Sequence, residues 1–183
     1  ACRGVATVIT TANSMQRGGP DNPQTVDLEG NFNLIDAAKA GGVKHFIFVS
    51  MNIADPKSPV PFAQAKGRAE EHLRSSNIPY TIVAPNAFME VWLGMAVCKP
   101  AVEGKPVTLV GSGKRKHSFI SAVDVTKFVV SSVDNPRAIN RRLLMGGPEP
   151  VSFNDAVKTC EQLLKRKIPV EIATPGQTIA PLP

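Results

Sequence analysis

The sequence predicts an α/β fold in which helices flank a parallel sheet. Three short runs rich in β-branched and aromatic residues, at 5–9, 45–50 and 80–83, have the composition of buried strands. The segments that join them carry helical patterns, and crossover helices between short buried strands are typical of a parallel sheet with right-handed connections. Hydrophobic residues at 43% and charged residues at 20% of the 183 residues are ordinary for a globular domain.

The first of these connections begins with a loop and ends in a helix. Residues 17–24 are rich in Gly, Pro and Asn, which predicts the loop. Residues 27–40 carry an apolar stripe at helical spacing, which predicts the helix. Gly41 and Gly42 end it in the manner of a C-cap.

The second connection has the same order. A Pro-bearing loop at 52–61 leads into a helix at 62–75, and the third strand stops at Pro85. The first half of the chain is therefore expected to fold as strand, helix, strand, helix, strand.

The second half is less regular. Short strands are predicted at four places, and two helices are predicted to begin with capping boxes, Ser121 with Asp124 and Ser152 with Asp155. The four predicted strands lie at 107–110, 118–120, 142–145 and 170–172. We expect residues 1–90 to form a partial nucleotide-binding domain. Residues 91–183 are expected to form the far edge of its sheet and a small C-terminal substrate-side lobe.

Charge and composition exclude several classes of partner. The net charge is +6, but the basic clusters are spread along the chain and aromatic residues are only 5%, which disfavours nucleic-acid binding. No apolar run approaches the roughly 20 residues of a membrane-spanning helix, and no secretory leader is recognisable. We therefore expect no membrane partner and a cytoplasmic location.

The three cysteines predict neither a disulfide framework nor a metal site. Cys2, Cys98 and Cys160 are few and far apart in the sequence, so reduced thiols are expected. No other cluster of metal-ligating residues is apparent in the sequence, and no metal is predicted.

A ligand is expected beyond the carboxyl ends of the predicted strands. In an open parallel sheet these ends share one rim, where ligands bind. Three small or polar segments follow the strands, at 10–13, 50–52 and 85–88. They suit close approach to a ribose and a nicotinamide amide, but they are equally compatible with ordinary turns between strands and helices.

A glycine-rich phosphate-binding turn is absent from the chain. No Gly-x-Gly-x-x-Gly follows a predicted strand. Residues 111–113, Gly-Ser-Gly, precede a basic run and another strand pattern, so they predict a hairpin turn instead.

Several ordered motifs resemble the NmrA-like branch of the atypical short-chain dehydrogenase/reductases. The first is DLEGNFNLIDAAKAGGVKHFIFVS at 27–50, and the others are Lys66 with Glu70 and Leu73, IPYTIVAPNAF at 78–88, and SFISAVDV at 118–125. The resemblance covers about residues 5–175. It implies a Rossmann-type fold that binds NAD(P)H, with the N-terminal βαβ unit and its glycine-rich turn missing from this chain. The choice between NAD and NADP would lie in the same missing part.

The resemblance also implies which residues bind the cofactor. Thr11, Ala12 and Asn13 match the loop along the adenosine-side ribose and pyrophosphate, and Ser50, Met51 and Asn52 match the loop under the nicotinamide ribose. Pro85, Asn86, Ala87 and Phe88 match the loop that meets the nicotinamide ring. Lys66 matches the family lysine that hydrogen-bonds the nicotinamide ribose, and it is the one catalytic candidate.

The sequence departs from the family at one informative position. Members with dehydrogenase chemistry carry Tyr-x-x-x-Lys, whereas this chain reads Phe62-Ala-Gln-Ala-Lys66. Its single tyrosine, Tyr80, begins the third predicted strand, at the opposite end of the sheet. A tyrosine proton relay is therefore not expected. Lys66 could also simply pair with Glu70 one helical turn later.

The resemblance thus implies an NAD(P)H-dependent oxidoreductase that reduces a quinone-, azo- or flavin-like acceptor. The alternative is a non-catalytic NAD(P)-sensing regulator that binds a partner protein. Phe88, Met89, Trp92 and Met95 form an apolar stripe that either packs in the core or lines the site of a flat aromatic substrate. Met89, Trp92 and His117 are the candidate substrate residues.

Overall fold

The computed structural model describes residues 2–15 and 17–174. The chain divides into two compact units, each of which is described by itself. Unit 1 comprises Ala1–Pro85 and Val123–Met145, and unit 2 comprises Asn86–Ala122 and the chain from Gly146 onward. The final part of the predicted C-terminal lobe, residues 175–183, lies outside the described residues.

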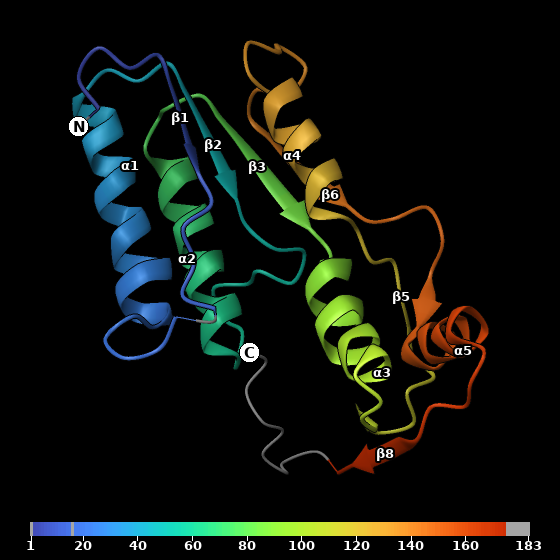
Figure 1. The fold of residues 1–183 in the computed structure, drawn as a ribbon. Coiled ribbons are helices and arrows are strands. Elements are labelled where there is room, and N and C mark those ends of the chain that lie inside the picture. Colours follow the sequence, from blue (N-terminus) through green and yellow to red (C-terminus); the bar gives the residue numbers. More distant parts are fainter. Residues whose placement is uncertain (1, 16, 175–183) are drawn as a thin grey trace. The chain divides into compact units, whose positions relative to one another are not determined.

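Unit 1 is built on a four-stranded sheet. The strands are β1 (Thr7–Thr10), β2 (His45–Val49), β3 (Tyr80–Pro85) and β6 (Arg141–Met145), in the order β1-β2-β3-β6. Every neighbouring pair is parallel, and β1, β2 and β3 run side by side in Figure 1. The predicted α/β fold with a parallel sheet is confirmed.

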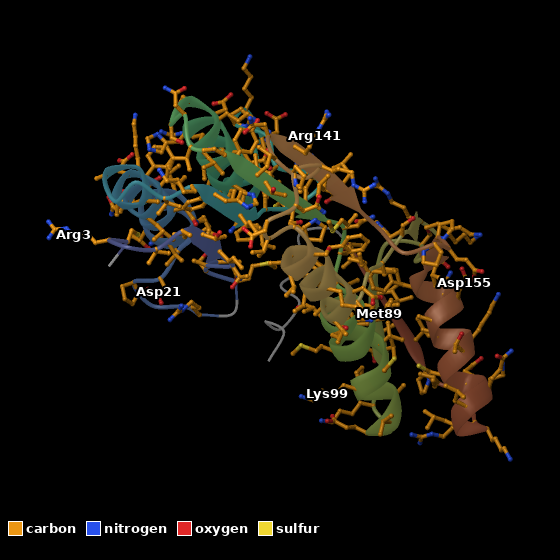
Figure 2. All side chains as sticks on the ribbon, turned by 90° about the horizontal axis from the view of Figure 1, so that it is seen from above. Arg3, Asp21, Met89, Lys99, Arg141 and Asp155 are labelled. Atoms are coloured by element: carbon orange, nitrogen blue, oxygen red, sulfur yellow. The ribbon has the colours of Figure 1, made fainter. Side chains whose placement is uncertain are left out.

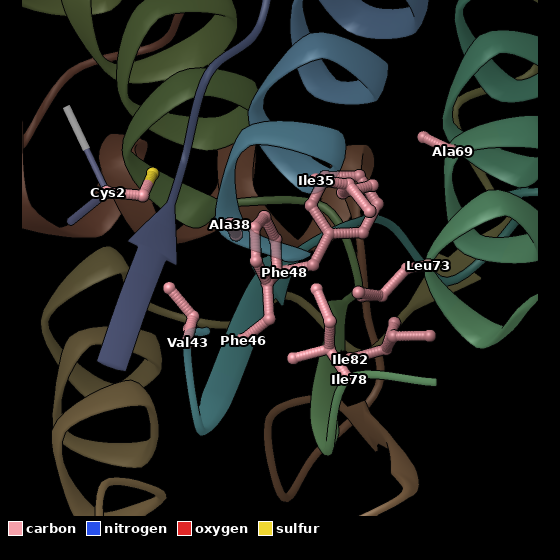
Figure 3. Packing of buried hydrophobic residues seen from close by; sticks show 10 residues of the cluster. All are labelled: Cys2, Ile35, Ala38, Val43, Phe46, Phe48, Ala69, Leu73, Ile78 and Ile82. Atoms are coloured by element: carbon pink, nitrogen blue, oxygen red, sulfur yellow. The ribbon is translucent and has the colours of Figure 1, made fainter. Parts of the chain in front are cut away.

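Helices η1 (Pro23–Gly30), α1 (Asn31–Ala40) and α2 (Pro61–Ser75) connect these strands. One face of the sheet packs against α1 and α2 through Phe46 and Phe48 of β2, which are fully buried. Ile35 and Leu73 come from the two helices to the same cluster (Figure 3). The apolar stripes on the helices thus form the core of unit 1.

The first connecting helix is longer than the sequence pattern indicated. It begins at Pro23, inside the segment expected to be a loop, and its first turns are π-helical. The Asn22 side chain accepts from the backbone N–H of Gln24 and Thr25, and the Thr25 hydroxyl accepts from the Asn22 N–H. This capping box starts the helix early.

Unit 2 contains the helices η2 (Glu90–Cys98), α3 (Lys99–Val102) and α5 (Phe153–Leu164). Its strands β4 (Val107–Val110) and β8 (Val170–Ala173) pair in parallel, and β5 (Lys116–His117) and β7 (Val151–Ser152) pair antiparallel. Its core gathers around Val97, Val107 and Val157. The capping box of Ser152 with Asp155 is confirmed. In unit 1, helix α4 (Ala122–Ser131) precedes β6 and buries Val125 and Val129.

Two local predictions in this region are wrong. The strand expected at 118–120 is absent from the described chain: the short strand β5 lies at Lys116–His117, and Ile120 forms an isolated bridge with Phe88. Residues 111–113 make a turn with positive φ at both glycines, but they do not join a hairpin, because β4 pairs with β8 and β5 pairs with β7.

Candidate functional site

The carboxyl ends of β1, β2 and β3 meet at one rim of unit 1. The loop after β2 is fixed to the end of β3 by two backbone hydrogen bonds, from Ser50 N to Val83 O (2.8 Å) and from Asn52 N to Pro85 O (2.9 Å). The structure therefore brings Ser50, Met51 and Asn52 together with Pro85. Parallel pairing places the segment that follows β1 at the same rim.

Lys66 of α2 reaches the loop that follows β1. Its ammonium donates to the carbonyl oxygen of Ala12 at 2.7 Å and lies 3.2 Å from Asp27 Oδ1. Both Lys66 and Asp27 are buried, with 3% and 0% of their side chains exposed. The simple pairing of Lys66 with Glu70 is therefore wrong, because the lysine points to Ala12 and Asp27 instead.

Burial lowers the pKa of Lys66, and the nearby Asp27 carboxylate opposes that shift. The ammonium also lies 5.1 Å from the centre of the Phe48 ring and 5.8 Å from that of Phe62. Both rings can stabilise a desolvated cation through their faces. Phe62 thus presents its ring face to the Lys66 ammonium, but it carries no hydroxyl.

Asp27 is the centre of a buried polar network. Its Oδ2 accepts from both the backbone N–H and the hydroxyl of Ser14, at 2.9 and 2.6 Å. Its Oδ1 has no hydrogen-bond partner of good geometry in the described chain, so the ion pair with Lys66 compensates it. Asn31 donates to the Asp27 carbonyl at 2.9 Å and accepts from Thr10. This network fixes Thr10 and Ser14, the two residues that flank the loop at residues 11–13.

A second buried carboxylate supports the loop after β2. Glu70 of α2 accepts from the Ser50 hydroxyl at 2.6 Å and pairs with Arg142 of β6 at 2.8 Å and with Arg74 at 2.7 Å. Arg142 also donates to the carbonyl of Met51 at 2.9 Å. The Glu70 carboxylate therefore fixes Ser50, and the Arg142 guanidinium fixes Met51, in the loop predicted to lie under the nicotinamide ribose.

Sequence reasoning did not identify Ser14, Asp27, Glu70 or Arg142 as site residues. Asp27 and Glu70 both stood in the motifs that carried the family resemblance, and that was the available signal. Their partners lie far away in the sequence, so only the fold brings them together.

Gly67 allows α2 to approach the loop at residues 55–56. A Cβ at this position would collide with the backbone of Asp55 and Pro56. Because Gly67 follows Lys66 directly, this close contact sets the depth at which the lysine enters the rim.

The remaining predicted residues lie in unit 2. Ile120 N donates to Ala87 O, and Met89 N donates to Ile120 O, so the segment at 86–88 is held against Ile120. Met89 and Trp92 are each 39% exposed, so core packing is the wrong interpretation for these two residues. Met89 and Lys99, labelled in Figure 2, flank helix η2, whose buried residue is Val97.

His117 belongs to an aromatic group in unit 2. Its ring centre lies 5.5 Å from that of Phe119 and 6.2 Å from that of Phe153. These contacts involve ring packing, and they leave the role of His117 in substrate binding a prediction.

The tyrosine lies at the end of the sheet away from the rim. Tyr80 is the first residue of β3, and its carbonyl accepts from Asn140 N at 2.6 Å. It is the chain's single tyrosine, so no phenol accompanies Lys66.

Residues 2–15 and 17–174 contain neither a cluster of metal ligands nor a membrane-spanning helix. In this part of the chain no group of three or more His, Cys, Asp or Glu residues could hold a metal ion. The same residues include no helix that is long and apolar enough to cross a membrane.

Comparison with known proteins places this geometry in context. The model of the NmrA-like family matches residues 1–182. The photosystem II assembly factor Ycf39 of Trieres chinensis is 31% identical over 161 residues, which cover 88% of this chain and 50% of that protein. The NAD(P)H azoreductase of Xenophilus azovorans is 32% identical over 119 residues, covering 65% of this chain and 41% of that protein.

A solved structure shares the fold. UDP-glucuronic acid 4-epimerase from Bacillus cereus, in complex with NAD, matches with a TM-score of 0.81 and 19% identity, over 94% of this chain and 64% of that one. At this identity the likeness is one of fold, and it agrees with the predicted Rossmann-type sheet. The chain spans about half the length of the curated relatives it matches.

Proposed function

The chain belongs to the NmrA-like family, and from this premise we propose that it is part of an NAD(P)H-dependent oxidoreductase. The observation that carries the proposal is the hydrogen bond from Lys66 to Ala12 O at the rim of the sheet. It joins α2 to the loop after β1, beside the loop that Glu70 and Arg142 hold. Two buried charged residues, Lys66 and Glu70, thus fix the loops after β1 and β2, which the family resemblance assigns to the cofactor.

The residues at this rim suit the two riboses of a dinucleotide, with Thr11 and Asn13 on the adenosine side and Lys66 on the nicotinamide side. Thr11 and Asn13 are exposed and carry hydroxyl and amide groups suited to ribose hydroxyls. An ammonium has three N–H donors, of which Lys66 donates one to Ala12 O, while Asp27 Oδ1 lies 3.2 Å from the ammonium as its ion-pair partner. We propose that a remaining N–H donates to the nicotinamide ribose. The phosphate-binding turn would come from a part of the protein outside this chain.

When bound, NAD(P)H supplies a hydride, and the protein orients it and excludes competing reactions. The only tyrosine of the sequence, Tyr80, begins β3 at the end away from the rim, so no phenol stands beside Lys66 to protonate an alkoxide. An acceptor that can take its second proton from water needs no such donor. This favours a quinone-, azo- or flavin-like acceptor over a simple ketone, and a relative of the chain is an azoreductase.

Met89 and Trp92 are our candidates for acceptor binding. Both are large, apolar and exposed in unit 2, and an aromatic ring binds other flat rings by stacking. His117 is a third candidate because its ring belongs to an aromatic group.

The test uses the full-length protein, titrated with NADH and NADPH and then supplied with a quinone, an azo dye or a flavin. We expect nucleotide binding, followed by loss of the NADPH absorbance when the acceptor is added. Trp92→Ala should raise KM for the acceptor by about fivefold without changing the nucleotide Kd. Phe62→Tyr, which places a phenol near Lys66, should leave the rate of quinone reduction unchanged, because a quinone does not need that proton donor. An absence of nucleotide binding would contradict the proposal.

A second candidate is a non-catalytic NAD(P)-binding regulator that acts on a partner protein. It is favoured by the likeness to an assembly factor, which covers more of the chain than the likeness to the azoreductase does. Tight nucleotide binding without turnover of any of the three acceptors would support this candidate and contradict the reductase.

A further inference from the structure

Two of the three cysteines meet inside unit 2. Cys98 Sγ and Cys160 Sγ are 3.5 Å apart, although 62 positions separate them in the sequence. Cys98 is the last residue of η2, and Cys160 lies within α5. Both thiols are reduced, and the third cysteine, Cys2, belongs to the core of unit 1.

The surroundings of the pair are apolar. Cys160 is 7% exposed and packs with Val97, Val157 and Ile168, while Cys98 is partly buried at the edge of the same cluster. A disulfide has an S–S length of about 2.05 Å, so the two sulfurs must approach by about 1.5 Å from their 3.5 Å separation. Cys98 is the last residue of η2, and the α-helix α3 begins directly after it.

We propose that Cys98 and Cys160 form a redox-active dithiol that low-molecular-weight disulfides oxidise to an intramolecular disulfide. The Cys98 thiolate attacks one sulfur of the small disulfide, forms a mixed disulfide and releases one small thiol. The Cys160 sulfur then loses its proton, attacks Cys98 Sγ and releases the second small thiol. The protein loses two protons and two electrons, and the small disulfide is reduced to two thiols.

The order of these steps follows from burial. Cys98 is the more exposed of the two residues, so the external disulfide reaches it first. Burial, together with the hydrogen bond to Cys98 and the charge of the Cys98 sulfur, raises the pKa of Cys160 to about 11. Cys160 therefore stays protonated until the mixed disulfide has formed beside it. The oxidised pair would link η2, which carries Trp92, covalently to α5.

The test is a redox titration of the full chain in glutathione buffers, with no nucleotide present. Samples are quenched in acid, denatured, alkylated and analysed by mass spectrometry. We expect two of the three thiols to become protected, with the Cys98 and Cys160 peptides joined. The third thiol, Cys2, should remain alkylatable. Because no nucleotide is used, this result is independent of the proposed oxidoreductase activity.

Single variants separate the role of Cys98, which attacks the small disulfide, from that of Cys160, which attacks the mixed disulfide. Cys160→Ser should accumulate a stable glutathione adduct on Cys98, whereas Cys98→Ser should gain neither an adduct nor a disulfide. Cys2→Ser should oxidise like the wild type, and circular dichroism checks that each variant folds. Three free thiols in oxidising buffer, or a persistent adduct on wild-type Cys98, would overturn the proposal. The peptide map of the wild-type protein gives this answer even if a variant does not fold.

Discussion

The two units bury different kinds of side chain. In the described chain, unit 1 buries Asp27, Lys66 and Glu70 together with several hydroxyl and amide groups, whereas Ser152 is the one buried polar residue of unit 2. Buried charges require specific partners at specific distances, but apolar packing tolerates rearrangement. The difference indicates that the rim of unit 1 is held in one arrangement by specific polar contacts, while the core of unit 2 depends on apolar packing.

The largest effect is expected when the buried ion pair of unit 1 is broken. Lys66→Met leaves the Asp27 carboxylate buried beside Ser14 without its counter-ion, which should lower the free energy of unfolding by about 3–5 kcal/mol. Urea denaturation measures this loss. The exposed Lys57→Met serves as the matched control and should stay within about 0.5 kcal/mol of wild type.

A double variant sharpens the same comparison. Lys66→Met combined with Asp27→Asn removes both charges, so it should recover part of the stability that the single variant loses. If Lys66→Met alone were as stable as wild type, the rim of unit 1 would not depend on this pair.

A smaller loss is expected at the second carboxylate. Glu70→Gln weakens the contacts with Arg142 and Ser50, but both arginine partners of Glu70 can reach water, so we expect a loss of about 2 kcal/mol. The full-length protein should also bind NADPH more weakly, because the loop at Met51 loses its support. The neighbouring Glu71, which is exposed, provides Glu71→Gln as the control. Equal effects of the two substitutions would contradict the positioning role of Glu70.

The smallest effect concerns a buried polar group away from the rim. Thr81 Oγ1 donates to Ala138 O at 2.8 Å, so it accepts from His45 Nε2 at 2.9 Å, and His45 Nδ1 has no partner in the described chain. Burial lowers the pKa of His45 below its usual 6.5, and Asp134 partly opposes this shift. The unfolded chain therefore binds the proton first as pH falls.

The contribution of His45 to the free energy of unfolding is therefore present above the pKa of His45 in the unfolded chain. It is lost as the pH falls through about 6.5 toward the lower pKa of the folded protein. Urea midpoints at a series of pH values should fall more steeply for wild type than for His45→Gln. Identical pH profiles would show that burial of this histidine does not affect folding.

The sheet could be predicted from the sequence because its strands are short, uncharged runs with clear ends. The polar networks could not be predicted, because Lys66 meets Asp27, and Glu70 meets Arg142, only after the strands have paired. The early start of η1 was obscured because Asn22 caps the helix from within a Gly- and Pro-rich segment.

The same limit applies in unit 2. An apolar stripe predicts a buried face, and Val97 is buried, but Met89 and Trp92 are exposed on the same helical segment. The contact of Cys98 with Cys160 could not be predicted from the spacing of the cysteines, because 62 positions separate the two residues. The roles of Lys66, of the three rim loops and of Met89, Trp92 and His117 in binding remain predictions.

The position of β6 has a consequence for the synthesis of the protein. This edge strand pairs with β3, yet all of the first segment of unit 2 is translated between them. Arg142, which holds Met51 and Glu70, is also among the last residues of unit 1 to leave the ribosome. The rim loop after β2 can therefore reach its final form only late in translation, and until then the β3 edge is open to a chaperone or to another nascent chain.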